Sequence, residues 1–332
     1  MTIDRRSLLL GSLAAGMTAR AAAQTRPPST AESRWLIVAD PSETIDLWPG
    51  LPPGASARLP VETVHERSKD PAYNDRYVVG ISRPRMAVFR AAKPTGGGAL
   101  IFPGGGYRWV VVDKEGYEMA RLLAARGITA FVLFYRLPGE GSTTGPDTPL
   151  IDAQRAMRII RSRAASYALD PNRICAMGFS AGGHVCASLM TRFAAQVYRA
   201  TDAVDRLSAR PAIAAPIYPV ISMTPPTAHT GSREELLGRH PTAVQERKYN
   251  PALNVPADAP PAFLLHAEND PSVPVANTLM LRKALLAAKV PVETHLYPDG
   301  GHGFGLRLSR GHSVEGWQDV FYAWGKKRGV FA

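Results

Sequence analysis

Short apolar runs recur along the chain and alternate with longer segments of helical spacing. Several of these runs are almost entirely apolar and rich in β-branched and aromatic residues, which is typical of strands buried on both faces. The predicted strands lie in 85–91, 98–105, 128–137, 173–180, 212–222, 259–270 and 291–298.

The segments between the runs place apolar residues at helical spacing. The first predicted helix closes on Gly127 at a C′ position, and the second is ended by Asp170-Pro171. The predicted helices span 115–127, 150–170, 181–195, 276–289 and 315–327. This alternation predicts an α/β fold, with a mostly parallel central sheet covered by helices on both faces.

Two stretches depart from the alternation. Residues 138–149 form a loop rich in Gly, Pro and Thr, and residues from about 223 to 258 combine prolines with short helical segments. Two capping boxes are expected in the second stretch, at Ser232 to Glu235 and at Thr242 to Gln245. We expect 223–258 to be a small helical insertion over the C-terminal edge of the sheet, where open α/β sheets bind ligands.

The N-terminus reads as an export signal. Arg5 and Arg6 precede an apolar run from 8 to 17, and small residues at 21–23 resemble a cleavage site. The alternatives are an amphipathic helix or a membrane anchor, but the run is about half of the ~20 residues that a membrane span needs. We therefore expect a twin-arginine signal at 1–23, a tether at 24–33 and one catalytic domain at 34–332, in the periplasm or secreted, with no membrane span in the mature form.

The chain is basic, with 39 Lys and Arg against 28 Asp and Glu, a formal charge of +11. Removal of 1–23 takes away three arginines and one aspartate and leaves +9. The cations are scattered rather than clustered, which argues against nucleic-acid binding. The charge fits either an anionic partner such as an acidic polysaccharide or an ordinary basic surface.

Cys175 and Cys186 are the only two cysteines of the sequence. A disulfide is possible in an oxidising compartment, but the predicted strand and helix that carry them diverge. We expect two buried free thiols, and the spacing indicates no metal site.

Ser180 stands in Gly178-Phe179-Ser180-Ala181-Gly182, between a predicted strand and a predicted helix. A nucleophile elbow needs this context, because flanking glycines allow the sharp turn that exposes the hydroxyl. The stretch "IFPGGGYRW", 101–109, puts glycines after an earlier strand, the position of an oxyanion loop. We expect the N–H groups of Gly105 or Gly106, together with that of Ala181, to form the oxyanion hole.

Asp270 and His302 each follow a later predicted strand, which gives the order Ser180, Asp270, His302 of a nucleophile, acid and base. His302 would take the proton of Ser180, and Asp270 would orient the imidazole. The rival carboxylates are poorly placed: Glu268 is still inside its strand and Asp299 is too close to His302 in sequence. His184 lies one turn into a predicted helix and His266 within a predicted strand, so we expect both to be structural. His312 follows the last loop and is a weaker base candidate.

With these residues in place, the chain resembles the α/β-hydrolase superfamily, and within it the microbial carbohydrate esterases grouped with acetylxylan and feruloyl esterases. The resemblance covers about residues 45 to 326 and has Pro103 where the lipase-type H-G-G-G loop has histidine. It is carried by "LWPGLPPG", "PGGGY", "EGYEMARLLAARGI", "FYRL", "DAQRAMRIIRSRAA", "DPNRI", "GFSAGGH", "YPVIS" and "GGHGFG".

The resemblance implies a serine esterase that removes acetyl, or else feruloyl, groups from plant-wall oligosaccharides without a cofactor. Tyr107 and Trp109 follow the glycine loop, and they either contact the substrate or pack against a neighbouring loop. The alternatives are a general short-chain esterase or peptidase of the same fold, or a glycan-binding relative that has lost catalysis.

Overall fold

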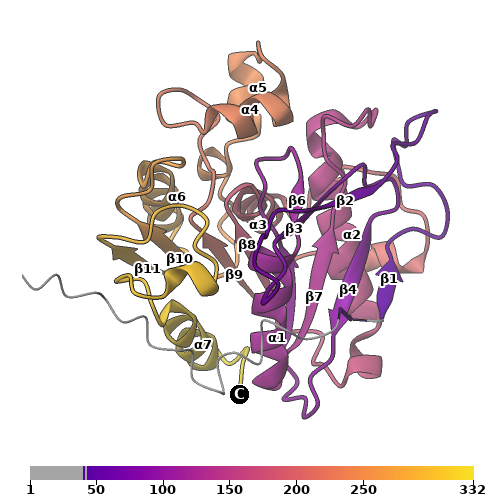
Figure 1. The fold of residues 1–332 in the computed structure, drawn as a ribbon. Helices are drawn as coiled ribbons and strands as arrows, with labels where there is room; N and C mark the ends of the chain where they lie inside the picture. Colours follow the sequence, from indigo (N-terminus) through magenta and orange to yellow (C-terminus); the bar gives the residue numbers. More distant parts are fainter. Residues whose placement is uncertain (1–39, 42) are drawn as a thin grey trace, which may run out of the picture. The chain divides into compact units, whose positions relative to one another are not determined.

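The computed structural model describes residues 40, 41 and 43–332 of the chain, which form one compact unit around an eight-stranded sheet (Figure 1). Its strands, in spatial order, are β1 (Thr44–Asp46), β4 (Arg85–Phe89), β7 (Thr129–Phe134), β5 (Gly98–Phe102), β8 (Ile174–Phe179), β9 (Ile213–Ile217), β10 (Ala262–Ala267) and β11 (Val292–Tyr297). The pairs β1–β4 and β4–β7 are antiparallel, and the pairs from β7 to β11 are parallel. Each predicted run therefore contains a strand.

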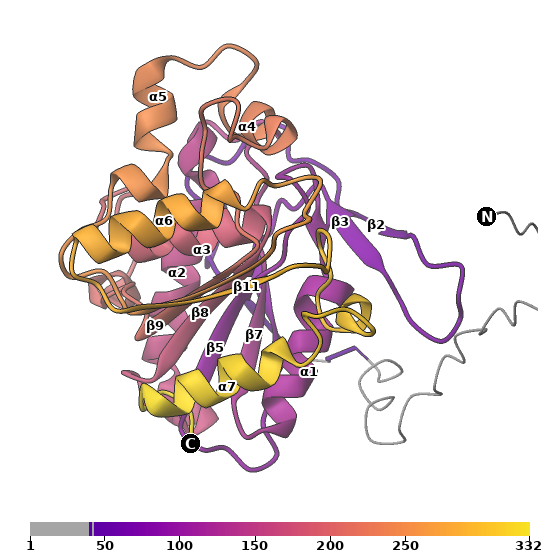
Figure 2. The same ribbon diagram turned by 90° about the vertical axis from the view of Figure 1, so that its left-hand side faces the viewer.

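Helices cover both faces of this sheet, which confirms the predicted layers. Figure 2 shows α1 and α7 on one face and α2, α3 and α6 on the other. Their bounds are α1 (Glu118–Ala125), α2 (Thr148–Ser162), α3 (Ala181–Arg192), α6 (Ala276–Ala287) and α7 (Trp317–Lys327). Gly127 has φ +83° directly after the C-cap of α1, as its predicted C′ position requires.

Two helix boundaries differ from the prediction. The segment expected to start the first helix at 115 begins as a π-helical turn, Asp113–Tyr117. The second helix ends at Ser162 rather than at Asp170, because a 3-10 turn (Ala164–Tyr167) closes on Ala168 in the left-handed conformation and redirects the chain.

A second sheet of three short strands was not predicted. It pairs β2 (Thr63–Glu66) with β3 (Arg76–Val79) and β3 with β6 (Val110–Val111), all antiparallel. Every residue of β2 is exposed and β6 has only two residues. Neither strand therefore shows the alternation of apolar and polar residues from which a strand is predicted. This sheet places Arg67 and Trp109, which adjoin β2 and β6.

The insertion at 223–258 carries α4 (Thr230–Leu237) and α5 (Ala243–Lys248), at the top of Figure 1. The capping box from Thr242 to Gln245 is confirmed. The box from Ser232 to Glu235 is wrong: the N-cap of α4 is His229, three residues before Ser232. The His229 side chain accepts the Ser232 N–H at 3.1 Å.

The predicted signal at 1–23 and tether at 24–33 lie outside the described residues. In the described part, no helix has both the length and the apolar character to span a bilayer. Cys175 and Cys186 are buried free thiols, as expected.

Candidate active site

Ser180 forms the turn between β8 and α3 with a strained backbone, at φ +54° and ψ −118°. The two flanking glycines are required by close packing. A Cβ on Gly178 would lie 2.1 Å from the carbonyl oxygen of Gly182, and a Cβ on Gly182 would lie 2.1 Å from that of Phe102. The structure thus has the strand–serine–helix turn that the glycine spacing predicts.

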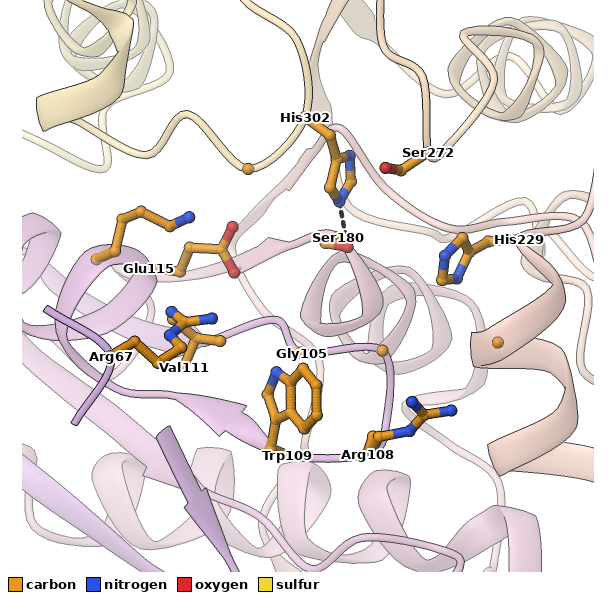
Figure 3. Close-up of a pocket in the computed structure, with 14 residues that line it drawn as sticks. Arg67, Gly105, Arg108, Trp109, Val111, Glu115, Ser180, His229, Ser272 and His302 are labelled. Atoms are coloured by element: carbon orange, nitrogen blue, oxygen red, sulfur yellow. Dashed lines mark hydrogen bonds between the residues drawn. The ribbon is translucent and has the colours of Figure 1, made fainter. Parts of the chain in front are cut away.

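Two hydrogen bonds link the serine, the histidine and the aspartate. Ser180 Oγ lies 2.8 Å from His302 Nε2, the dashed contact in Figure 3. His302 Nδ1 lies 2.6 Å from Asp270 Oδ2. Because the ionised carboxylate can only accept, Nδ1 carries the proton, which leaves Nε2 as the acceptor for the Ser180 hydroxyl. The histidine therefore has the tautomer of a general base toward Ser180.

Asp270 is fixed from several directions and its side chain is fully buried. Its Oδ1 accepts the N–H groups of Ser272 and Val273, both at 2.8 Å. Burial by itself would raise the pKa of this carboxyl, but hydrogen bonds from His266 and His302 hold the pKa well below its usual range. The carboxylate stays ionised at neutral pH.

His266 shares this carboxylate without facing the pocket. Its Nε2 lies 3.2 Å from Asp270 Oδ2 and 3.0 Å from the Val273 carbonyl oxygen, while Nδ1 lies 2.7 Å from the Thr278 hydroxyl. Its side chain is fully buried, whereas that of His302 is 20% exposed. His266 therefore supports Asp270, in agreement with the structural role expected for it.

The glycine loop presents free amides beside Ser180. Gly105 has φ +129°, and a Cβ there would lie 2.1 Å from the Trp109 carbonyl oxygen, so only glycine fits. The N–H groups of Gly105, Gly106 and Ala181 donate to no protein acceptor in the described part of the chain. They remain the predicted oxyanion donors.

Glu115 is a buried site residue that the sequence analysis missed. Its Oε2 accepts the Gly104 N–H at 3.0 Å, and its Oε1 accepts the Tyr218 hydroxyl at 2.9 Å. That hydroxyl accepts the Gly305 N–H at 3.2 Å, and the Tyr218 ring packs edge-on against His302. One carboxylate thus connects the glycine loop to the His302 loop. In the sequence it reads only as an acid in a first helical turn.

A pocket of about 370 Å³ opens above Ser180 and His302. Figure 3 shows Arg67, Trp109, Arg108 and His229 around the serine. Burial, with the His302 charge as a second cause, lowers the pKa of His229 and favours its neutral form. The rest of the lining is Gly105, Gly106, Val111, Lys114, Glu115, Gly231, Ser272 and Gly303.

Trp109 lines this pocket, in agreement with a contact to substrate. That contact stays a prediction. The same expectation for Tyr107 is corrected, because Tyr107 is 2% exposed and absent from the lining. Its hydroxyl lies 2.5 Å from His184 Nδ1, and His184 Nε2 lies 2.7 Å from the Tyr249 carbonyl oxygen. These contacts tie the glycine loop to the residue that follows α5.

The rival candidates stay outside the site. Glu268 is exposed, and His312 pairs with Asp299 at 3.3 Å on the surface. Within the residues described, no group of three or more His, Cys, Asp or Glu side chains is arranged to hold a metal ion.

Comparison with known proteins agrees with this architecture. A model of the BD-FAE family matches residues 99–285. The chain is 35% identical to endo-1,4-beta-xylanase B of Butyrivibrio fibrisolvens and 32% identical to an acetylxylan esterase of Xylanibacter ruminicola. Each match covers 68% of this chain but only 34% and 44% of the respective relative. The chain therefore spans less than half the length of these curated relatives.

Solved structures extend the likeness. A crystal structure of an acetyl ester-xyloside bifunctional hydrolase from Caldicellulosiruptor lactoaceticus has a TM-score of 0.70 and 33% identity, and the match covers 89% of this chain and 99% of that one. A thermophilic esterase from Thermogutta terrifontis, at 21% identity and a TM-score of 0.62 over 82% of this chain and 97% of that one, shares the fold alone. The predicted α/β-hydrolase fold is confirmed.

Proposed function

Because the chain belongs to the BD-FAE family, we propose that it is a serine carboxylic-ester hydrolase that removes acetyl groups from plant-wall oligosaccharides. The observation that carries the proposal is the hydrogen-bonded chain Ser180–His302–Asp270, which opens on the pocket. The names of the acetylxylan esterase and the acetyl ester-xyloside hydrolase support two parts of the proposal: acetyl as the acyl group that is removed, and a plant-wall oligosaccharide as the sugar.

In the proposed mechanism, Ser180 Oγ attacks the ester carbonyl carbon while His302 Nε2 accepts the hydroxyl proton. The carbonyl oxygen becomes an oxyanion and accepts hydrogen bonds from Ala181 and from Gly105 or Gly106. As the C–O bond to the sugar breaks, His302 returns the proton to the leaving alcohol. Water, deprotonated by His302, then attacks the acyl-enzyme and releases acetate and free Ser180.

Glu115 acts as a positioning residue in this proposal. The Gly104 amide is held by the carboxylate, so the following glycine amides keep a fixed direction toward the ester. A donor of this kind is worth about 3 kcal/mol of activation free energy only when it is preorganised. The buried carboxylate thus supports the oxyanion hole without touching the substrate.

The sequence pattern at 1–23 supports export, so we place this activity in the periplasm or outside the cell. Cell fractionation tests this part separately. Recovery of the protein from the cytoplasm with residues 1–23 intact would contradict it.

The test of the mechanism is labelling with a fluorophosphonate together with turnover of acetylated xylo-oligosaccharides, feruloyl esters and p-nitrophenyl acetate. We expect labelling at Ser180, and Ser180→Ala should lower ester turnover by on the order of a thousandfold. Ser188→Ala is the control, because Ser188 lies on the same helix outside the pocket.

Each arm has its own negative result. A folded protein that does not label at Ser180 is no serine esterase, and a glycan-binding role would then take its place. Labelling without release of acetate or ferulate from any glycan would leave a general short-chain esterase.

A further inference from the structure

The residues that line the pocket carry more positive than negative charge. Three cationic side chains line it, those of Arg67, Arg108 and Lys114, against the single carboxylate of Glu115. Both oxygens of Glu115 already accept hydrogen bonds, from Gly104 and Tyr218. An incoming substrate therefore meets cationic donors whose charge Glu115 only partly offsets.

Arg67 is held in place with part of its guanidinium unused. Its Nε and Nη2 donate to Asp75, at 3.1 Å to the backbone carbonyl and 2.8 Å to Oδ1. The same Oδ1 also accepts a hydrogen bond from Arg307, at 2.8 Å, so Asp75 is shared by two guanidinium groups. Arg67 Nη1 donates to no acceptor among the residues described. A fixed arginine with a free edge suits a second, external anion.

Lys114 supplies a neighbouring positive charge. Its side chain is half-buried and forms no ion pair or hydrogen bond with the part of the chain that the structure describes. Its Nζ would lie 3.4 Å from a Cβ built on Gly303, the residue after His302. Lys114 also interacts electrostatically with Glu118, but without a hydrogen bond or a close ion pair among the described residues. A half-buried ammonium in this setting carries a desolvation cost that a bound anion would offset.

Arg67 and Lys114 belong to one side of the pocket. Figure 3 shows Arg67 beside Glu115, the chain neighbour of Lys114, and Glu115 Oε1 lies close to the same Gly303 position as Lys114 Nζ. Arg108 lies on the other side of Trp109 in this view and pairs with Glu235 at 3.1 Å. The free cationic donors therefore gather between β2 and the His302 loop.

We propose that Arg67 and Lys114 form a carboxylate subsite, and that the substrate is an acylated oligosaccharide that carries a uronic acid near the ester. This inference rests on the proposed esterase function and names its substrate class. Lys114 supplies a point charge for one carboxylate oxygen, and Arg67 Nη1 supplies a directed donor for the other. The basic net charge of the chain favours encounter with such acidic glycans.

The experiment compares two substrates that differ in one charge. An acetylated xylo-oligosaccharide with a glucuronic acid branch is assayed beside the same compound with its carboxylate methyl-esterified, and acetate release gives kcat/KM for each. We expect the acid to be the better substrate by about tenfold, the effect of one or two charge-assisted hydrogen bonds. The preference should shrink as salt is added.

Substitutions test whether the preference for the acid over the methyl ester depends on Arg67 and Lys114. Lys114→Met and Arg67→Met should each reduce the ratio of acid to methyl ester toward one. Arg108→Met, the matched control, removes a charge from the same pocket across Trp109 and should keep the ratio. Equal loss of preference in all three variants would indicate a diffuse field and overturn the subsite.

Failure of this proposal differs from failure of the esterase function. A wild-type protein that releases acetate from both compounds equally well is an esterase without a carboxylate subsite. A protein that hydrolyses neither compound nor p-nitrophenyl acetate has no esterase function.

Discussion

Ser180, Asp270 and His302 each follow a strand in the parallel part of the eight-stranded sheet, whereas Arg67 and His229 lie on segments outside that sheet. We call Ser180 and His302, with the buried Asp270 behind them, the floor of the pocket. We call Arg67, His229, Trp109 and Lys114 its wall. The residues of the floor are positioned by the regular parallel pairing of neighbouring strands in the main sheet. The wall is positioned by the three-stranded sheet, by the turn before α1 and by the insertion.

The comparison separates two tasks. The carboxyl ends of neighbouring parallel strands meet at one edge, so residues after β8, β10 and β11 come together whatever the wall contains. In the function we propose, the floor therefore carries out the reaction and the wall selects the substrate.

The largest expected effect is on the floor. In Asp270→Asn the amide would face His302 and favour the wrong imidazole tautomer, so kcat should fall by about a thousandfold or more. His266→Gln disturbs the same carboxylate from its buried side and should reduce kcat by less than about tenfold. Steady-state kinetics of both variants measure the difference; a loss in His266→Gln as large as that in Asp270→Asn would contradict the supporting role of His266.

The next effect concerns the link between the glycine loop and the insertion. Burial lowers the pKa of His184 to about 4, so the folded protein keeps this imidazole neutral while the unfolded chain takes up a proton near pH 6.5. This contribution to stability is complete above pH 6.5 and is lost as the pH falls toward 4. It amounts to about 3 kcal/mol.

Urea unfolding at pH 7 and at pH 4 checks this prediction. His184→Gln should be less stable than the wild type at pH 7, and its free energy of unfolding should fall less on acidification. An identical pH dependence in both proteins would mean that His184 does not titrate with folding.

The smallest effect lies where floor and wall meet, at Glu115. Glu115→Gln leaves one amide N–H facing a donor, either Gly104 N–H or Tyr218 O–H, so one hydrogen bond is lost. If the carboxylate orients the oxyanion loop, kcat should drop by about tenfold while KM stays nearly constant.

Glu140→Gln is the matched control for this variant. Glu140 Oε1 accepts the Gly80 N–H at 2.5 Å, the same kind of carboxylate–amide contact, and Glu140 is not part of the pocket lining. Thermal unfolding reports the stability of each variant, and kcat should change only in Glu115→Gln. A loss of kcat in both would point to a general effect of stability.

The sequence was sufficient for the elements with a strong local pattern. Apolar runs such as that of β8 and helices such as α3 were predicted close to their observed bounds, because burial on both faces leaves an unbroken apolar signal. The exposed β2 and the two-residue β6 carry no such signal and were missed. The start of α4 was misplaced because a histidine, a residue outside the usual capping set, is its N-cap.

The fold class, the turn at Ser180 and the chain order of Ser180, Asp270 and His302 could be predicted without the structure. These features depend on residues that are close together in the sequence. The sequence alone shows the glycines two residues before and after Ser180, and it shows the polar residues that follow the predicted strands. The burial of Tyr107 and the exposure of Trp109 to the pocket became visible only in the three-dimensional arrangement. The same is true of the residues that line the pocket around Ser180: Arg67, Lys114, Glu115 and His229. The physical reason is that burial and contact depend on residues far apart in the chain, such as Arg67 and His302, which no local pattern relates.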